Sequence, residues 1–280
     1  MLRVICASFV LTALAIAQPQ LTYVDTYIAK VKPEKRADFD ALMKKMADAN
    51  RKNKGDNWTT GQVEYGEQNT LYMNAGRANL AAIDDGMKAF NNALKEAYGS
   101  AAAERLMQDA DKCLISSRGE LRRVRADLSS NASADPADLF KLIAKARFVR
   151  AMMVHVRPGR TLDYEAQLRM IKEANQRSNR ERVALVSQSA AGQSGTVFYI
   201  TQWGSSLGSF DNLPTLPQLL GDDGYARYSR MSGENISGTE TLILRYLPEL
   251  SNPPEQIVQA DPEFWKPKPA PTKPKPGSQN

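Results

Sequence analysis

Residues 31–41 read VKPEKRADFDA, and residues 156–166 read VRPGRTLDYEA. Valine, proline, aspartate and alanine recur at the same places in both stretches, and four further places hold similar residues. Shorter matches follow in the same order, as between residues 71–73 and 197–199. Matches in a constant order predict an internal duplication. The spacing is far longer than that of solenoid repeats, so each copy is expected to be a domain.

The same elements are expected in both copies, in the order strand, helix, strand, strand, helix, strand. β-branched and aromatic residues with period-two alternation indicate the strands, and apolar residues at helical spacing indicate the helices. In the first copy the strands are expected at 23–31, 58–65, 70–75 and 120–125, with helices from Pro33 and over 80–94 and 101–115. In the second copy the strands are expected at 148–156, 183–187, 196–203 and 239–247, with helices over 161–175 and 225–231.

This βαββαβ order is the ferredoxin-like topology, an antiparallel sheet with helices on one face. A second copy can cover the other face. Residues 31–39, with the pattern V-K-P-E-K-x-x-x-F before an amphipathic helix, resemble the opening of dimeric α+β barrel proteins. That superfamily includes the NIPSNAP and antibiotic-biosynthesis-monooxygenase-like families. The resemblance implies an α+β fold in which two tandem ferredoxin-like repeats pair their antiparallel sheets into a barrel, here within one chain.

The N-terminal residues 1–17 have the pattern of a secretory signal peptide. Arg3 supplies a positive charge, an uncharged apolar stretch follows, and Ala15-Ile16-Ala17 is a cleavage motif. A membrane anchor is the alternative, but the apolar stretch is shorter than the roughly 20 residues of a spanning helix. We therefore expect a secreted or periplasmic protein, cleaved after Ala17, with no transmembrane span after cleavage.

The C-terminal residues 253–280 are rich in proline and lysine. Proline lacks a backbone donor and does not fit a helix interior, so a disordered tail is expected, either solubilising or in contact with an envelope partner. The adjacent aromatic residues Phe264 and Trp265 instead indicate a segment that docks on its own domain or on a partner. The expected organisation is a signal peptide at 1–17, ferredoxin-like repeats at 18–131 and 147–252, a linker helix at 132–146 opened by Asp135-Pro136, and the tail at 253–280.

The composition excludes several classes of protein. Hydrophobic residues make up 42% and charged residues 24% of the 280 residues, which is typical of soluble globular proteins and not of collagens or polytopic membrane proteins. Residues 18–252 carry 32 basic and 28 acidic residues, and this net charge of +4, in a chain expected to be secreted, is too small to indicate a nucleic-acid partner. A monomer is expected. Two basic clusters are interpreted as solvated faces: Arg118, Arg122, Arg123 and Arg125, and Arg177, Arg180 and Arg182.

Cysteine and histidine are scarce. Cys6 lies in the signal peptide, so Cys113 is the cysteine of the mature chain, and its helical spacing from Ala110 favours a buried thiol over a reactive or intermolecularly bonded one. His155, the only histidine, aligns with Lys30 and is expected at a polar rim. One histidine cannot form a multi-histidine metal site, so no metal and no cofactor are predicted; a lone haem ligand is the alternative.

Strand alternation supplies the candidate binding residues. Tyr23, Asp25 and Tyr27 share one face of the first strand, and Phe148 and Arg150 share the matching face of its counterpart, with Met152. We expect both faces to point into the barrel. Asp25 and Arg150 would then meet there, as a buried salt bridge or as the polar part of a ligand pocket. The candidate ligand-binding residues are Tyr23, Asp25, Tyr27, Tyr72, Asn74, Arg150, Tyr199 and Trp203.

The sequence contains none of the common catalytic signatures: the nucleophile elbow, the Walker loop, the Rossmann fingerprint, the zinc-binding H-E-x-x-H and C-x-x-C are absent. The leading hypothesis is therefore a non-enzymatic barrel that binds a small apolar or aromatic ligand or a partner. The resemblance implies an alternative, a cofactor-independent monooxygenase-like or haem-handling enzyme, but no family pattern assigns a catalytic residue. A third hypothesis is a cell-envelope structural protein that acts through its tail.

Overall fold

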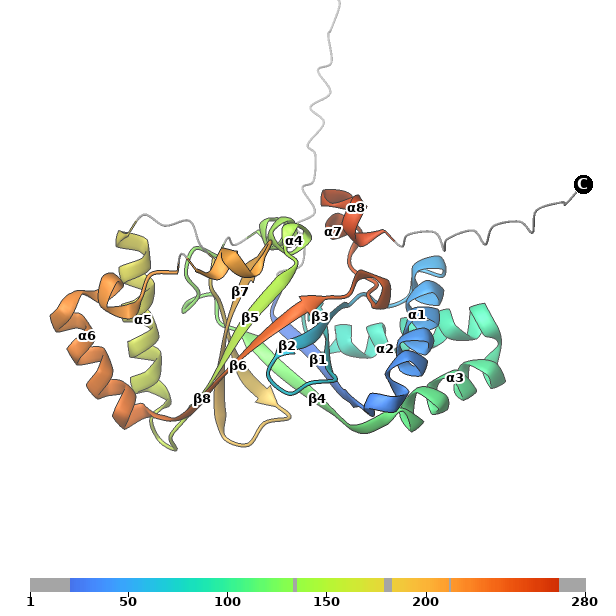
Figure 1. Ribbon diagram of the computed structural model, residues 1–280, viewed down its shortest axis with the longest axis horizontal. Helices are drawn as coiled ribbons and strands as arrows, with labels where there is room; N and C mark the ends of the chain where they lie inside the picture. Colours follow the sequence, from blue (N-terminus) through green and yellow to red (C-terminus); the bar gives the residue numbers. More distant parts are fainter. Residues whose placement is uncertain (1–20, 133–134, 179–182, 212, 267–280) are drawn as a thin grey trace, which may run out of the picture.

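Eight antiparallel strands form a closed barrel in the computed structural model of the chain, which describes residues 21–132, 135–178, 183–211 and 213–266 (Figure 1). Around the barrel the strands follow the order β1-β3-β2-β8-β5-β7-β6-β4. Their bounds are β1 Tyr23–Val31, β2 Thr59–Tyr65, β3 Thr70–Arg77, β4 Leu114–Val124, β5 Phe148–Val156, β6 Leu185–Ala191, β7 Thr196–Gly204 and β8 Ile236–Tyr246.

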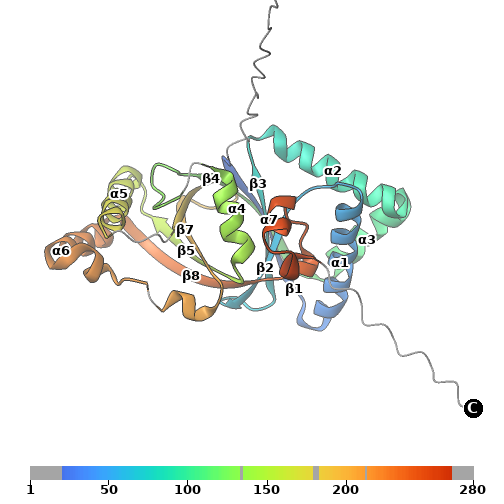
Figure 2. The same cartoon turned by 90° about the horizontal axis from the view of Figure 1, so that it is seen from above.

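Helices cover the barrel on two opposite sides and at one open end (Figures 1 and 2). Helices α1, α2 and α3 lie on one side, α5 and α6 lie on the other, and α4, α7 and α8 lie over the end. Their bounds are α1 Arg36–Lys52, α2 Ala81–Tyr98, α3 Ser100–Lys112, α4 Pro136–Lys145, α5 Thr161–Arg177, α6 Leu216–Asn235, α7 Glu255–Ala260 and α8 Pro262–Trp265.

The barrel consists of two groups of four strands with equivalent strand order. The first group has the order β4-β1-β3-β2 and the second has the order β8-β5-β7-β6. Two seams join the groups: β2 pairs with β8 from Gly61 onward, and β4 pairs with β6 over Leu121–Val124. The α+β barrel expected from the sequence is therefore confirmed, while its origin in a tandem duplication stays a prediction.

Each side of the barrel has its own apolar core. Under α1 and α3, Phe39, Met46 and Leu71 belong to one buried cluster, which also contains the predicted buried thiol of Cys113. Under α5, Tyr164 packs on Phe198 with ring centroids 5.1 Å apart. These two cores leave the barrel interior as a separate space.

The linker helix begins where the sequence predicted. Asp135 is the N-cap residue of α4, its side chain accepts a hydrogen bond from the backbone N–H of Ala137 at 2.8 Å, and Pro136 occupies the first turn. Two other elements differ from expectation. β4 begins at Leu114, within the expected helix, and α6 runs from Leu216 to Asn235 across a kink at Gly221, whose positive φ of 71° interrupts the helical backbone.

The C-terminal segment differs from the predicted tail over residues 253–266, which form α7 and α8 on the barrel end. Trp265 is buried and donates a hydrogen bond from its indole Nε1 to the carbonyl of Ala144 in α4 at 3.0 Å. Arg147 forms an ion pair with Asp261 at 2.8 Å and lies over the ring of Phe264. Buried apolar surface thus overrides the low helix propensity of this proline-containing segment.

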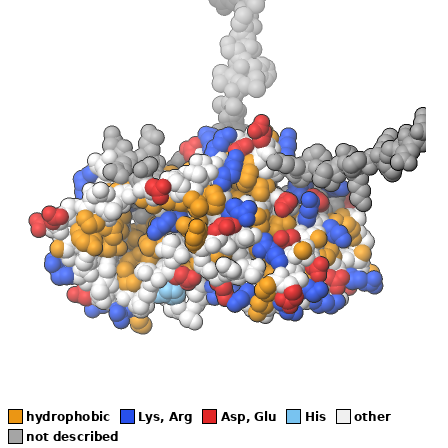
Figure 3. Space-filling view, in the orientation of Figure 1, with side chains coloured by type: hydrophobic (Ala, Val, Ile, Leu, Met, Phe, Trp, Pro, Cys, Tyr) orange, Lys and Arg blue, Asp and Glu red, His pale blue; other side chains and the backbone are white. Residues whose placement is uncertain are grey.

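The predicted signal peptide at 1–17 and the remaining tail at 267–280 lie outside the described residues. Within the described ranges, no helix has the length and apolar character needed to cross a membrane. Figure 3 shows acidic and basic side chains interspersed over one face of the molecule.

Candidate functional site

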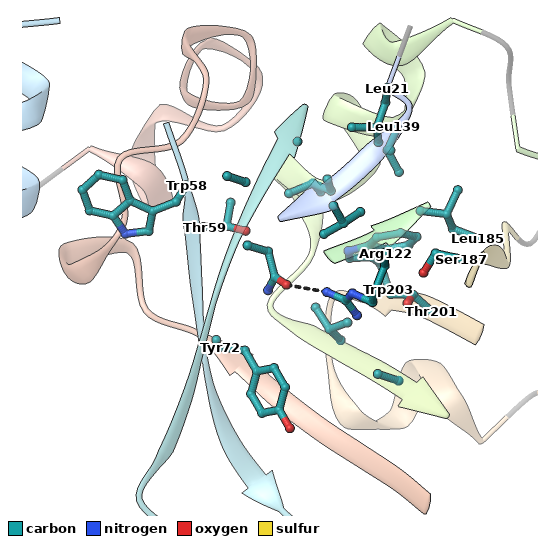
Figure 4. Close-up of a pocket in the computed structure, with 18 of the residues that line it drawn as sticks. Leu21, Trp58, Thr59, Tyr72, Arg122, Leu139, Leu185, Ser187, Thr201 and Trp203 are labelled. Carbon is teal, nitrogen blue, oxygen red and sulfur yellow. Dashed lines mark hydrogen bonds between the residues drawn. The ribbon is translucent and has the colours of Figure 1, made fainter. Parts of the chain in front are cut away.

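A cavity of about 250 Å³ occupies the barrel interior (Figure 4). Inward-facing side chains from strands of both groups line it, because alternate residues of each strand point into the barrel. Most of its walls are apolar. They include Val24, Val149, Ala151, Met153, Leu185, Leu242 and Leu244.

Two basic residues line this space, Arg77, which is paired with Asp56, and Arg122, which has no ion pair within 4.0 Å among the described residues. The side chain of Arg122 enters the cavity from β4, is only 8% exposed, and donates from Nη2 to the hydroxyl of Thr26 at 2.5 Å and to the amide oxygen of Asn74 at 2.8 Å (Figure 4). Its Nε is buried without a hydrogen-bond partner. Among the described residues, no carboxylate lies within the 4.0 Å of an ion pair with Arg122.

Burial lowers the pKa of the Arg122 guanidinium from its usual value. Because arginine side chains are effectively always protonated in proteins, the group is taken as charged. The ring of Tyr199 stabilises the cation, because the guanidinium carbon lies 4.6 Å from the ring centroid. The mostly apolar cavity is therefore lined by a positive charge that has no direct ion pair and one unpartnered donor, while Glu120 acts on the charge from a greater distance.

Glu120 lies two residues before Arg122 on β4 and is connected to it through Tyr199, whose hydroxyl bonds Glu120 and whose ring lies against Arg122. Its carboxylate is buried and accepts hydrogen bonds from the hydroxyl of Tyr199 at 2.8 Å and from the side chain of Gln193 at 2.6 Å, while Arg118 pairs with it from outside. Burial first, and then the charge of Glu120, raise the pKa of Tyr72 to about 12, so Tyr72 is protonated at neutral pH.

The two ends of the barrel differ in polarity. At one end, Phe140 and Ile143 of α4 and Ile257 of α7 close the cavity with apolar side chains. At the other end, a polar recess is lined by charged residues such as Lys30, Glu67, Arg118 and Glu240. Tyr72, Met153 and Leu242 line both spaces and so form the boundary between them.

Four of the residues proposed from the sequence line this cavity. Tyr72 and Asn74 reach it from β3, and Tyr199 and Trp203 reach it from β7. The indole of Trp203 donates to the hydroxyl of Tyr246 at 3.0 Å, which fixes the ring at the wall. Whether these residues bind a ligand stays a prediction.

The expected orientation of β1 and β5 was wrong. Val24 and Thr26 point into the barrel, so Tyr23, Asp25 and Tyr27 point outward, and Asp25 and Tyr27 line a different cavity under the helices. On β5 the inward residues are Val149, Ala151 and Met153. Helices cover the barrel outside, so both strand faces are buried and alternation does not reveal which face is the inner one.

The expected meeting of Asp25 and Arg150 does not occur. Asp25 pairs instead with Arg77, at 3.2 Å between Oδ2 and Nη2. Arg150 is half-buried on the outer face and donates weakly to Gln202 at 3.4 Å. Each of these strands lies inside its own group of four, so their outer faces are turned away from each other.

Two buried charged residues of β4, Glu120 and Arg122, were missed from the sequence, where Arg122 was placed in a solvated basic cluster. A signal was present. Arg122 lies opposite Val24 on β1, and Leu244 lies opposite Val149 at the equivalent place in the second group. Glu120 and Leu242 correspond in the same way. A charged residue in one group where the other has a buried leucine indicates a specialised position. Of the second cluster, Arg177 is exposed as expected, and Arg180 and Arg182 lie outside the described residues.

The lining of the cavity does not fit a haem held by histidine. His155 is half-buried near the end of β5, and neither it nor any other histidine or cysteine is among the described lining residues. Within the described ranges, no three histidine, cysteine or carboxylate side chains are grouped to bind a metal ion. The polar lining consists of Arg122, Asn74 and the hydroxyl groups around them, together with Asn57 and the ion pair of Asp56 with Arg77.

No protein-family model and no curated protein matches the sequence. Solved structures do match. An anthrone oxidase-like protein aligns over 83% of this chain and 94% of its own, with a TM-score of 0.51 and 10% identity. A haem-binding protein of Thermus thermophilus aligns over 83% of this chain and 93% of its own, with a TM-score of 0.45 and 12% identity. A provisionally assigned monooxygenase of Lactobacillus acidophilus aligns over 80% of this chain and 94% of its own, with a TM-score of 0.48 and 11% identity.

The likeness is one of fold. At such low identity it carries no residue role from those proteins to this chain. The match to the anthrone oxidase-like protein supports the α+β barrel, and the chemistry of the interior has to be argued from the side chains that line it.

Proposed function

We propose that the barrel binds a small apolar or aromatic molecule that carries one acidic or strongly hydrogen-bond-accepting group. The single observation that carries this proposal is Arg122, a buried cation whose Nε has no partner and which is surrounded by apolar walls. A buried donor without a partner costs free energy, and native proteins rarely keep one unless something uses it.

The charge of the ligand follows from the charge of the site. Arg122 has no carboxylate partner in the described part of the chain, and a carboxylate or phenolate would supply the missing counter-charge. A guanidinium presents parallel N–H donors that suit the two oxygens of a carboxylate. Nη2, whose N–H lies parallel to that of Nε, is engaged by Thr26 and Asn74, so the ligand would accept a single hydrogen bond from Nε.

The size and character of the ligand follow from the walls. A volume of about 250 Å³ is just below the roughly 300–1,000 Å³ typical of ligand pockets, so a single-ring acid suits it better than a fused polycycle. Val149, Leu242 and Leu244 supply apolar contact, and Trp203 supplies an aromatic face. The acidic group would lie at Arg122 and the ring towards the apolar end under α4.

The test is equilibrium binding of benzoate, with benzamide and benzyl alcohol as neutral probes of similar size. We expect benzoate to bind more tightly than either, because only benzoate brings a negative charge to Arg122. The Arg122→Met variant should lose most of that preference, at least about tenfold, as expected for a charged hydrogen bond. Arg123→Met is the matched control, since Arg123 is the exposed neighbour on the same strand.

Equal affinity for the three probes would refute the proposal, and so would a preference for benzoate that survives Arg122→Met. Both outcomes are readable only if the variant is folded, which its circular dichroism spectrum will show. Native mass spectrometry of the purified protein is a second measurement, because mass lost on denaturation would identify a retained natural ligand.

A cofactor-independent oxidase is the second candidate. A buried cation stabilises the anion of an ionisable aromatic substrate, and such a carbanion or enolate can react with O₂ directly. The fold likeness to an anthrone oxidase-like protein suggests anthrone as a probe, and anthrone and O₂ would give anthraquinone and water. Anthrone has three fused rings, so its turnover would also require the cavity of about 250 Å³ to enlarge. Oxygen consumption that requires both the protein and Arg122 would favour this candidate, and its absence would leave the binding function.

Export and the role of the tail remain part of the proposal. The signal-peptide pattern at 1–17 supports a secreted or periplasmic protein, and N-terminal sequencing of exported protein, with Gln18 as the first residue, tests it. Because residues 255–265 pack on the barrel, an envelope contact through the tail would involve residues 267–280. Truncation at residue 266 followed by cell fractionation tests that contact.

A further inference from the structure

A second cavity, of about 390 Å³, lies outside the barrel, between the outer face of β1 and β3 and the helices α1, α2 and α3. Figures 1 and 2 show these helices standing over that side of the sheet. Sulfur atoms and aromatic rings line most of it. The apolar lining residues that matter here are Phe39, Met43, Met73, Met87, Phe90 and Met107.

The helices leave this space open at its edge. Met87 of α2 is 57% exposed and Met107 of α3 is 40% exposed, although both line the cavity. α2 approaches the sheet closely at Gly86, where a Cβ atom would lie 2.4 Å from Nη1 of Arg77. Flexible methionine side chains at the opening can move to admit a ligand, because Met is unbranched and adapts to irregular shapes.

The charge of this cavity is opposite to that of the barrel interior. Its charged lining residues are Asp25, Asp56, Asp111 and Arg77. Asp56 takes the close bonds of Arg77, at 2.6 Å from Nη1 and 2.7 Å from Nη2. Asp25 receives only the longer contacts, at 3.2 and 3.4 Å, and its side chain remains 33% exposed.

We propose that this cavity binds a small amphipathic cation, with its ammonium group at Asp25 and its apolar part among the methionines. The carboxylate of Asp25 has acceptor capacity that Arg77 does not fill, and Asp111 adds a second negative charge. The ring of Tyr27, 40% exposed and also in the lining, offers a further surface for a cation. The two cavities adjoin, since Asp56, Trp58, Ala75 and Arg77 line both, but this proposal does not rest on the function proposed for the barrel interior.

Methionine methyl groups allow the two cavities to be observed separately. Met43, Met73, Met87 and Met107 line the outer cavity, and Met153 lines the barrel. We would titrate the protein, with its methionine methyls labelled with ¹³C, using n-octylammonium, n-octanol and n-octanoate, each below its micellar concentration. The three probes share one chain and differ in charge. n-Octylammonium should cause saturable shifts of the methyl resonances of the outer-cavity methionines and leave the methyl resonance of Met153 unshifted.

Two variants test the role of the carboxylate. Asp25→Asn should reduce the preference for n-octylammonium over n-octanol by about three- to tenfold, as expected for one partly exposed charge pair. Asp163→Asn removes the same charge from an exposed position at the start of α5 and should change nothing. Asp56 stays bonded to Arg77 in both variants, so neither is expected to unfold.

Uniform or absent methyl shifts would overturn the proposal. It would equally be overturned if n-octanoate shifted the outer-cavity methyls at the same concentrations, or if Asp25→Asn kept the full preference for the cation. A shift confined to Met153 with n-octanoate would support the barrel function alone, so the two proposals can fail separately.

Discussion

Two buried arginines show how the same side chain can serve opposite purposes in one protein. Arg77 is neutralised by Asp25 and Asp56 and joins β3 to the segment before β2. Arg122 has hydrogen bonds to Thr26 and Asn74 but no ion pair in the described part of the chain. The first arrangement stabilises the fold, and the second leaves a charge without a direct ion pair at a cavity.

Replacing Arg122 by methionine is expected to leave the protein as stable or to stabilise it by about 1 kcal/mol. Removing a buried, unpaired charge relieves its desolvation cost, and an unbranched apolar side chain suits the surrounding leucines. Thr26 and Asn74 keep their mutual hydrogen bond of 2.9 Å. Urea unfolding followed by circular dichroism measures the change. A loss above about 2 kcal/mol would show that Arg122 is chiefly structural.

The same change at Arg77 should behave differently. Arg77→Met leaves two carboxylates close together without their cation, so a loss of about 2–3 kcal/mol is expected in the same urea experiment. This contrast between the two arginines separates a structural role from a binding role. If both variants lost the same stability, Arg77 and Arg122 would not differ in role.

Residue-level prediction from sequence succeeded where local pattern decides and failed where the whole barrel decides. Tyr72, Asn74, Tyr199 and Trp203 line the cavity. Asp25 does not, since period-two alternation fixes which residues share a face and does not say which face is inside. Arg122 could have been found only by comparing the two groups of strands, where a leucine holds its counterpart position.

Among the elements, α4, α7 and α8 control the apolar end of the barrel. Phe140 of α4 and Ile257 of α7 line the cavity directly. Trp265 packs against Tyr246 with ring centroids 5.2 Å apart, so the C-terminal segment is held by the same strand that lines the cavity. This segment is a cover that is attached by a buried apolar cluster including Ile257 and Trp265 and by the ion pair of Asp261 with Arg147.

Acid should loosen this cover. The hydrogen bond from Arg147 lowers the pKa of Asp261 below its usual value near 3.8, and the charges of Arg147 and Lys145 act in the same direction. A carboxyl whose folded-state pKa is lowered stabilises the folded state above its unfolded-state pKa, and this contribution is lost as the pH falls through the folded-state value. We therefore expect full protection of residues 255–265 at pH 6 and a loss of protection below about pH 4.

Hydrogen exchange of the backbone amides of residues 255–265, measured between pH 6 and pH 3 and corrected for the intrinsic rates, tests this expectation. Asp261→Asn is the control, because it removes the titrating group and should give reduced protection that no longer falls at acid pH. Unchanged protection of the native segment at pH 3 would show that Trp265 alone holds it.

Most element boundaries followed from sequence because strand and helix periodicities are local. The exceptions have particular causes. A short helix over 225–231 was expected because Pro214 and Pro217 interrupt the pattern, yet α6 begins at Leu216 and continues across the kink at Gly221. The residues of α7 and α8 looked like a tail because their composition is that of linkers, and the buried surface that orders them is contributed by α4 and β8.

At the scale of the whole molecule, closure of the barrel makes the two groups of strands one cooperative unit. The seams β2–β8 and β4–β6 supply backbone pairing, and Arg125 at the end of β4 reinforces the second seam through Glu165 on α5. Neither group has free sheet edges of its own in the closed barrel.

We expect a single thermal unfolding transition as a result. Differential scanning calorimetry should give one peak whose calorimetric enthalpy equals the van't Hoff enthalpy, the signature of all-or-none unfolding. Two separated peaks would mean that each group of strands is stable by itself and that the seams contribute little. The barrel, and the cavity inside it, would then depend on weak docking of two domains.

The proposed binding function depends on Nε of Arg122 being a free donor reserved for a ligand inside this closed barrel. The sharpest measurement is the ¹⁵N–¹H resonance of Arg122 Nε in the protein with and without saturating benzoate, assigned by its loss in Arg122→Met. We predict a downfield shift of the Nε proton and slower exchange with water when benzoate binds, as this unpartnered donor gains an acceptor. An Nε resonance that saturating benzoate leaves unchanged would mean that Arg122 does not hold the ligand.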